Sequence, residues 1–111
     1  MKKDYSKELL DFISKHPSVF HVIEGQKKQL EEAGYTCLIE SKPWKLKEGG
    51  KYFVTRNGSS IIAFRIPRNN FNGFMIMASH SDSPSLKIKE NPEIKVDGKY
   101  TKLNVELYGG F

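Results

Sequence analysis

A nearly uninterrupted apolar segment, residues 73–79, leads directly into His80-Ser81-Asp82 and constrains the fold more than any other feature of this chain. Strands with one solvent-facing side alternate polar and apolar residues, whereas this segment shows almost no alternation. We therefore expect a buried strand with both faces covered. Its carboxyl end would present His80 and Asp82 from a rigid element.

Two helices are expected before this segment. Apolar residues recur at helical spacing over residues 5–13, and Pro17 follows as a stop signal. Ser18 is a suitable N-cap for a second helix, and Gly34 is suited to its C-terminal cap. On the second helix the charged residues lie mainly opposite the apolar face; they are Lys27, Lys28, Glu31 and Glu32.

The pattern changes to strands after residue 34, and the Asn57-Gly58 pair predicts a tight hairpin turn. The strand-like segments are residues 35–39, 51–56, 60–66, 73–79, 86–89, 93–96 and 102–107. Helices followed by strands predict an α+β or α/β architecture. The continuous apolar segment favours an interior strand with helices on both faces, as in an α/β fold with a mixed sheet. The two helices can cover only part of the buried strand, so we expect an incomplete α/β domain.

The composition excludes several classes of protein. With 38% hydrophobic and 28% charged residues, the 111-residue chain is globular in character. Its net charge of +5 is spread along the sequence, which argues against a nucleic-acid partner. No signal-peptide core and no membrane-length apolar stretch is present, so a cytoplasmic location is expected. The one cysteine, Cys37, excludes an internal disulfide, and we expect a small buried thiol.

His80 and Asp82 are the candidate functional residues. A neutral imidazole binds zinc well, and in a strand residues two apart point to the same side. Asp82 could therefore orient the imidazole. A strand-end histidine is more often structural, and a catalytic zinc site needs about three protein ligands. Neither His16 nor His21 can be joined to His80 from the sequence.

Several ordered segments resemble the aspartyl aminopeptidase family of zinc metallopeptidases. Residues 74–89, which contain His80-Ser-Asp-Ser-Pro84, resemble that family's His-Thr-Asp-Ser-Pro segment. Residues 100–110, which contain Val105-Glu-Leu-Tyr-Gly-Gly110, resemble its Val-Glu-x-Tyr-Gly-Gly segment. The matching upstream segments, in the same order, are residues 18–21, 30–34 and 50–57.

The resemblance implies an aminopeptidase that removes N-terminal residues from peptides with a free N-terminus. It implies two divalent metals, with zinc as the cofactor, and water activated between them with a carboxylate as base. On the matching positions His80 would be a metal ligand and Asp82 the catalytic-site carboxylate that orients it. The residues that bind substrate stay undefined.

The resemblance also implies how the chain relates to the full enzyme. Residues 1–111 would form the N-terminal part of the catalytic domain and end near an inserted dimerisation domain. The remaining ligands would lie further along, the full-length protein would be a homo-oligomer, and the 111 residues alone would be inactive. Ser81 replaces the common threonine, and Phe111 stands where a third glycine is frequent.

Two alternatives remain open from the sequence. One is a small, basic, non-catalytic binding module in which His80 is structural. The other is a two-metal peptidase or deacylase of related fold, which later ligands would distinguish from an aminopeptidase.

Overall fold

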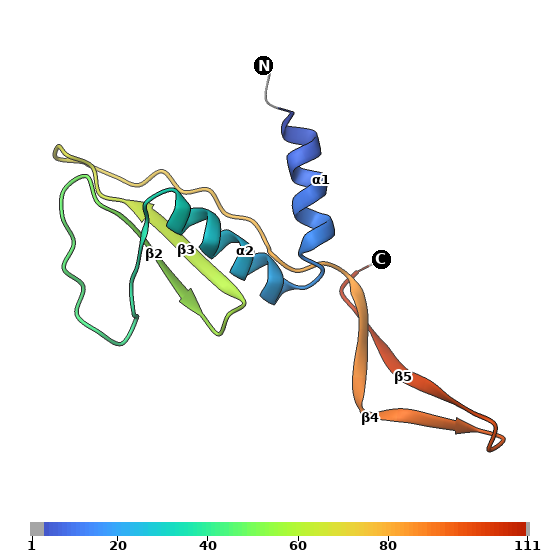
Figure 1. The fold of residues 1–111 in the computed structure, drawn as a ribbon. Coiled ribbons are helices and arrows are strands. Elements are labelled where there is room, and N and C mark those ends of the chain that lie inside the picture. Colours follow the sequence, from blue (N-terminus) through green and yellow to red (C-terminus); the bar gives the residue numbers. More distant parts are fainter. Residues whose placement is uncertain (1–3, 111) are drawn as a thin grey trace. The chain divides into compact units, whose positions relative to one another are not determined.

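The computed structural model describes residues 4–110 and divides them into two compact units, one ending at Ser81 and one beginning at Asp82 (Figure 1). The first unit contains α1 (Tyr5–Lys15), α2 (Val19–Glu32), β1 (Thr36–Cys37), β2 (Lys51–Arg56) and β3 (Ser60–Arg65). The second contains β4 (Ser85–Val96) and β5 (Tyr100–Tyr108). The position of the expected third glycine, Phe111, lies outside the described residues.

Both predicted helices are confirmed, and each begins at a side chain that caps it. Asp4 accepts a hydrogen bond from the Lys7 amide at 3.1 Å at the start of α1, and Ser18 accepts from the His21 amide at the start of α2. α1 has no buried residue, whereas α2 buries Ile23. Across residues 4–110 neither helix is long and apolar enough to cross a membrane.

A mixed three-stranded sheet forms the centre of the first unit. β2 and β3 pair antiparallel, with Asn57 and Gly58 at φ values of 54° and 64° in the turn between them, as the Asn-Gly signal predicts. β1 pairs parallel to β2, which gives the order β1-β2-β3. The predicted combination of two helices and a mixed sheet is therefore confirmed.

The core of the first unit combines Ile23 of α2 with two neighbouring residues of β2. Phe53 is fully buried and Tyr52 is 7% exposed. Because neighbouring strand residues point to opposite faces, these two rings serve opposite sides of the sheet. The Tyr52 ring lies 5.8 Å from its cross-strand partner Phe64, which in turn lies 6.2 Å from Trp44 of the preceding loop. Both faces of β2 are thus covered.

Cys37 is exposed, so the expectation of a buried thiol is wrong. β1 contains only two residues and lies at the edge of the sheet, where it pairs with β2 alone. A short edge strand has few neighbours to cover its side chains, which explains the exposure.

The second unit is one long hairpin. The two predicted strand segments 86–89 and 93–96 form a single strand, β4, whose pairing with β5 is irregular between Ile88 and Glu93. The turn at the far end contains Asp97 and Gly98, both with positive φ. Within residues 82–110 no side chain is buried, so backbone pairing is the main organising interaction.

Candidate functional site

His80 ends an apolar segment, residues 73–79, that lies outside every strand of the described part of the chain. The side chains from Phe74 to Met77 are exposed by 81% to 104%, so the predicted buried strand is wrong here. A strand requires a neighbouring backbone to complete its hydrogen bonds, and the strands of residues 4–110 pair only with one another. The apolar pattern indicates that this segment is suited to burial. It does not indicate which backbone would pair with the segment or which residues would cover it.

The segment lines a groove of about 650 Å³ together with β3 and α2 of the same unit. Ile23 and Gln26 of α2 and residues 61–64 of β3 contribute to the lining. In Figure 1 the segment, drawn in gold to orange, runs back along α2. Ser81, next to His80, donates a hydrogen bond of 3.3 Å to the Ser59 carbonyl and so ties this end of the segment to the β2–β3 turn.

A complete metal site is not present within residues 4–110, where no group of three or more His, Cys, Asp or Glu side chains is placed to hold a metal ion. His16 and His21 each contact a local helix-end group through Nδ1, at 2.6 Å from the Phe12 carbonyl and 2.7 Å from Ser18 Oγ respectively. Neither histidine joins His80 in such a group. The described residues therefore offer His80 as a ligand of the right chemistry and do not by themselves make a zinc site.

Asp82, the second predicted site residue, is half-buried at the base of the hairpin. The Tyr108 hydroxyl donates a hydrogen bond of 2.6 Å to Asp82 Oδ2. This hydrogen bond, followed by the negative charge of the carboxylate, raises the pKa of the Tyr108 hydroxyl, since both favour its protonated form. The carboxylate is thus held by a residue 26 positions away in sequence.

The backbone makes close contacts beside this hydrogen bond, at the base of the hairpin. Tyr108 pairs with Ser85 in the β4–β5 register. Gly109 follows with φ of 86°, and a Cβ at this position would lie 3.2 Å from Pro84 Cα. Glycine is required here both by the left-handed backbone and by the close approach of Pro84. Tyr108 was not singled out from the sequence, although the motif that contains it carried part of the resemblance.

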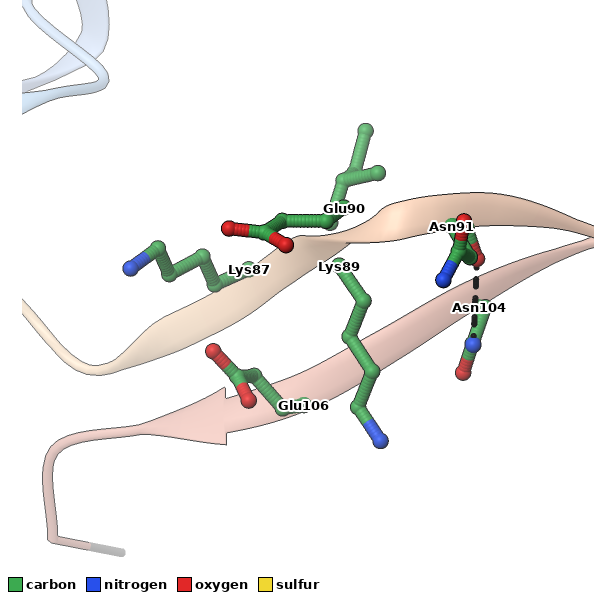
Figure 2. Close-up of a pocket in the computed structure, with 7 residues that line it drawn as sticks. Lys87, Lys89, Glu90, Asn91, Asn104 and Glu106 are labelled. Atoms are coloured by element: carbon green, nitrogen blue, oxygen red, sulfur yellow. Dashed lines mark hydrogen bonds between the residues drawn. The ribbon is translucent and has the colours of Figure 1, made fainter.

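A second groove, of about 420 Å³, lies along the hairpin and is shown in Figure 2. Its polar lining includes Lys87, Lys89, Glu90, Asn91, Asn104 and Glu106. The Asn104 side chain donates a hydrogen bond of 3.1 Å to the Asn91 carbonyl where the strand pairing is irregular. Neither His80 nor Asp82 lines this groove, so it is separate from the predicted site residues.

The described residues present two helices, a mixed sheet, a histidine after an apolar segment, and an aspartate that accepts a hydrogen bond from a distant tyrosine. The chain belongs to the M18 family, described as "Aminopeptidase I zinc metalloprotease (M18)", which matches residues 12–111. This confirms the family resemblance identified from the sequence.

Two clostridial proteins illustrate the similarity in sequence, each described as "Probable M18 family aminopeptidase 2". The protein of Clostridium novyi (strain NT) is 42% identical over 98% of this chain and 26% of its own length. That of Clostridium acetobutylicum is 43% identical over 96% of this chain and 25% of its own length. The chain therefore spans about a quarter of the length of these relatives.

Solved structures show the same similarity in fold. The structure of Chaetomium thermophilum mApe1 matches 94% of this chain and 24% of its own with a TM-score of 0.88 and 39% identity. The structure of the S. cerevesiae mApe1 dodecamer matches 96% of this chain and 26% of its own with a TM-score of 0.80 and 27% identity. The described fold thus corresponds to part of an aminopeptidase I subunit.

Proposed function

We propose that this chain is part of a zinc-dependent aminopeptidase that hydrolyses the N-terminal residue of peptides with a free N-terminus. The observation that carries the proposal is the M18 match over residues 12–111, which includes both His80 and Asp82. Exposure of the histidine at the end of an apolar segment is compatible with a ligand that further chain would surround.

In this proposal His80 supplies one imidazole ligand and Asp82 orients it. A bound zinc ion would supply Lewis-acid polarisation of the scissile carbonyl and a lowered pKa for its water. The other ligands, including those of a second divalent metal, would come from regions that the longer relatives possess beyond the matched quarter. Asp82 suits this role because its carboxylate accepts a hydrogen bond from the Tyr108 hydroxyl, which favours one orientation.

The proposal extends to assembly and location. One structural relative is described as a dodecamer, which supports a homo-oligomer for the full-length protein. The enzyme would act in the cytoplasm. Residues 1–111 would form the N-terminal part of its catalytic domain and would be inactive alone, because one histidine cannot complete a zinc site.

The test is the hydrolysis of N-terminal-residue substrates by the full-length protein, with and without a chelator, in wild type and in His80→Ala. We expect chelator-sensitive turnover in wild type and loss of turnover in His80→Ala. His21→Ala is the matched control because that exposed imidazole contacts its own helix cap, Ser18. It should retain turnover.

Wild-type turnover in His80→Ala would refute the ligand assignment and favour a structural histidine. Chelator-resistant turnover in wild type would refute the proposed zinc dependence. Turnover by the isolated 111 residues would refute their expected inactivity.

A further inference from the structure

We propose that Tyr108 is a positioning residue of the active site, which acts by holding the Asp82 carboxylate in the orientation needed to align His80. This inference rests on the proposed function, because it assigns Tyr108 a role toward the same metal ligand. The hydrogen bond links Asp82 of the histidine-aspartate segment to Tyr108 of the tyrosine-glycine segment, so it connects residues of the two sequence motifs that define the resemblance.

The first support is the geometry of the hydrogen bond. The Tyr108 hydroxyl lies 2.6 Å from Asp82 Oδ2, a short distance typical of a hydroxyl that donates to an ionised carboxylate. A carboxylate has two oxygen atoms, so a donor on Oδ2 is compatible with an imidazole N–H on the other oxygen. A fixed carboxylate can hold a ligand ring in one tautomer and orientation, whereas a rotating one cannot.

The second support is how firmly the hairpin places the tyrosine. Tyr108 is the last residue of β5 and pairs directly with Ser85, the first residue of β4. Gly109 then turns with φ of 86° against Pro84. The tyrosine is therefore held between a paired strand and a tight backbone contact, which limits the movement of its hydroxyl relative to Asp82.

The alternative is that the hydrogen bond only closes the base of the hairpin. In that case removal of the hydroxyl would change stability alone. A positioning role predicts a change in metal affinity and in kcat as well, because both depend on how the ligand is oriented. These readouts separate the two explanations.

The experiment uses the full-length protein and Tyr108→Phe, which removes only the hydroxyl. Zinc affinity is measured by chelator competition, and kcat and KM by substrate hydrolysis. A group that hydrogen-bonds a metal ligand typically contributes about 10- to 100-fold to metal affinity or activity. Tyr108 bonds Asp82 and not the ligand itself, so we expect an effect at the lower end of this range. Zinc affinity and kcat should fall about tenfold with KM unchanged.

Tyr100→Phe is the matched control, since Tyr100 is an exposed tyrosine at the other end of the same strand. It should change zinc affinity and kcat by less than about twofold, as expected of a site without shared partners. In an Asp82→Ala background, Tyr108→Phe should have no further effect on zinc affinity. The carboxylate through which Tyr108 is proposed to act is already absent there.

Wild-type zinc affinity and kcat in Tyr108→Phe would overturn the positioning role, even if thermal stability fell. An undiminished effect of Tyr108→Phe in the Asp82→Ala background would also overturn it, because the tyrosine would then act by another route. A wild-type protein that binds zinc but releases no N-terminal residue would refute the proposed function alone, since the zinc-affinity comparison would still test Tyr108.

Discussion

The two units of this chain are stabilised in different ways. The first surrounds Phe53, Tyr52 and Ile23 with a sheet, a helix and a loop, and these three residues are buried. The second is a two-stranded hairpin in which no residue from 82 to 110 is buried. A packed core stabilises the first unit, whereas the second depends on its backbone pairing, its turn and the contacts at its base.

The difference has a consequence for the proposed site. An isolated two-stranded hairpin is marginally stable in water, because it buries little apolar surface. The hydrogen bond from Tyr108 to Asp82 and the contact of Gly109 with Pro84 therefore matter more in the second unit than similar contacts would in the first.

Truncation of the fully buried ring, Phe53→Ala, should have the largest effect. Loss of a buried phenylalanine typically lowers the free energy of unfolding by about 3–5 kcal/mol, from lost burial and the cavity left behind. Hydrogen exchange in the full-length protein should show faster exchange at α2 and β2 amides, with hairpin amides unchanged. Phe71→Ala, at a half-exposed loop ring, is the control and should change little. Equal effects of the two variants would contradict the described core.

Gly109→Ala should open the base of the hairpin. The positive φ disfavours any side chain by about 1–2 kcal/mol, and the new Cβ would also meet Pro84 at 3.2 Å. Hydrogen exchange at the ends of β4 and β5 should quicken while first-unit amides keep their rates. The neighbouring Gly110→Ala provides a matched control because a Cβ there meets no atom within 4 Å. Unchanged hairpin exchange in Gly109→Ala would contradict the packing at this base.

The hydrogen bond at the base should make the second unit sensitive to alkaline pH. The pKa of Tyr108 is raised by its bond to Asp82 and by the carboxylate charge, so the folded state holds this proton more tightly than the unfolded state. The stabilisation is complete below the ordinary tyrosine pKa of about 10 and is lost as pH rises through the higher folded value. Tyrosinate absorbance, compared between wild type and Tyr108→Phe, should reveal one late-titrating group. An ordinary pKa for this group would contradict the bond.

The first unit should show a smaller pH effect of opposite sign. The Arg56 guanidinium hydrogen-bonds Glu40, by 3.1 Å from Nε to Oε2 and by a second contact through Nη2, and lowers the pKa of that carboxyl. The stabilisation from this ion pair is present above the ordinary glutamate pKa. It is lost as pH falls through the lower pKa that Glu40 has in the folded state. Both side chains are solvent-exposed, so the effect should be slight and reduced by salt. A salt-independent effect of Glu40→Gln on acid unfolding would contradict this account.

The sequence predicted local structure well where the signal is local. Ser18 and its helix follow from capping chemistry, and the Asn57-Gly58 turn follows from the tolerance of these residues for positive φ. The prediction of a buried strand over residues 73–79 failed. The apolar pattern indicates only that the segment is suited to burial, whereas a buried strand also needs a neighbouring backbone to pair with. The prediction that the Cys37 thiol is buried failed for a related reason. Its strand has only two residues and lies at the edge of the sheet, where few neighbours cover the side chain.

The contact between Tyr108 and Asp82 likewise could not be predicted from the sequence. His80 and Asp82 were identified as residues two apart after an apolar segment, whereas Tyr108 lies 26 residues from its partner. Its place depends on the register of a hairpin whose pairing is irregular between Ile88 and Glu93, and no spacing rule gives that register. The tyrosine motif was informative for family membership, and its hydrogen bond to Asp82 emerged only from the fold.

The most direct test of the central claim is anomalous diffraction at the zinc absorption edge from crystals of the full-length protein. We predict a zinc peak about 2.0–2.1 Å from an imidazole nitrogen of His80. A zinc peak bound elsewhere, with the His80 imidazole contacting only protein groups or water, would contradict the assignment of this chain's contribution to the metal site.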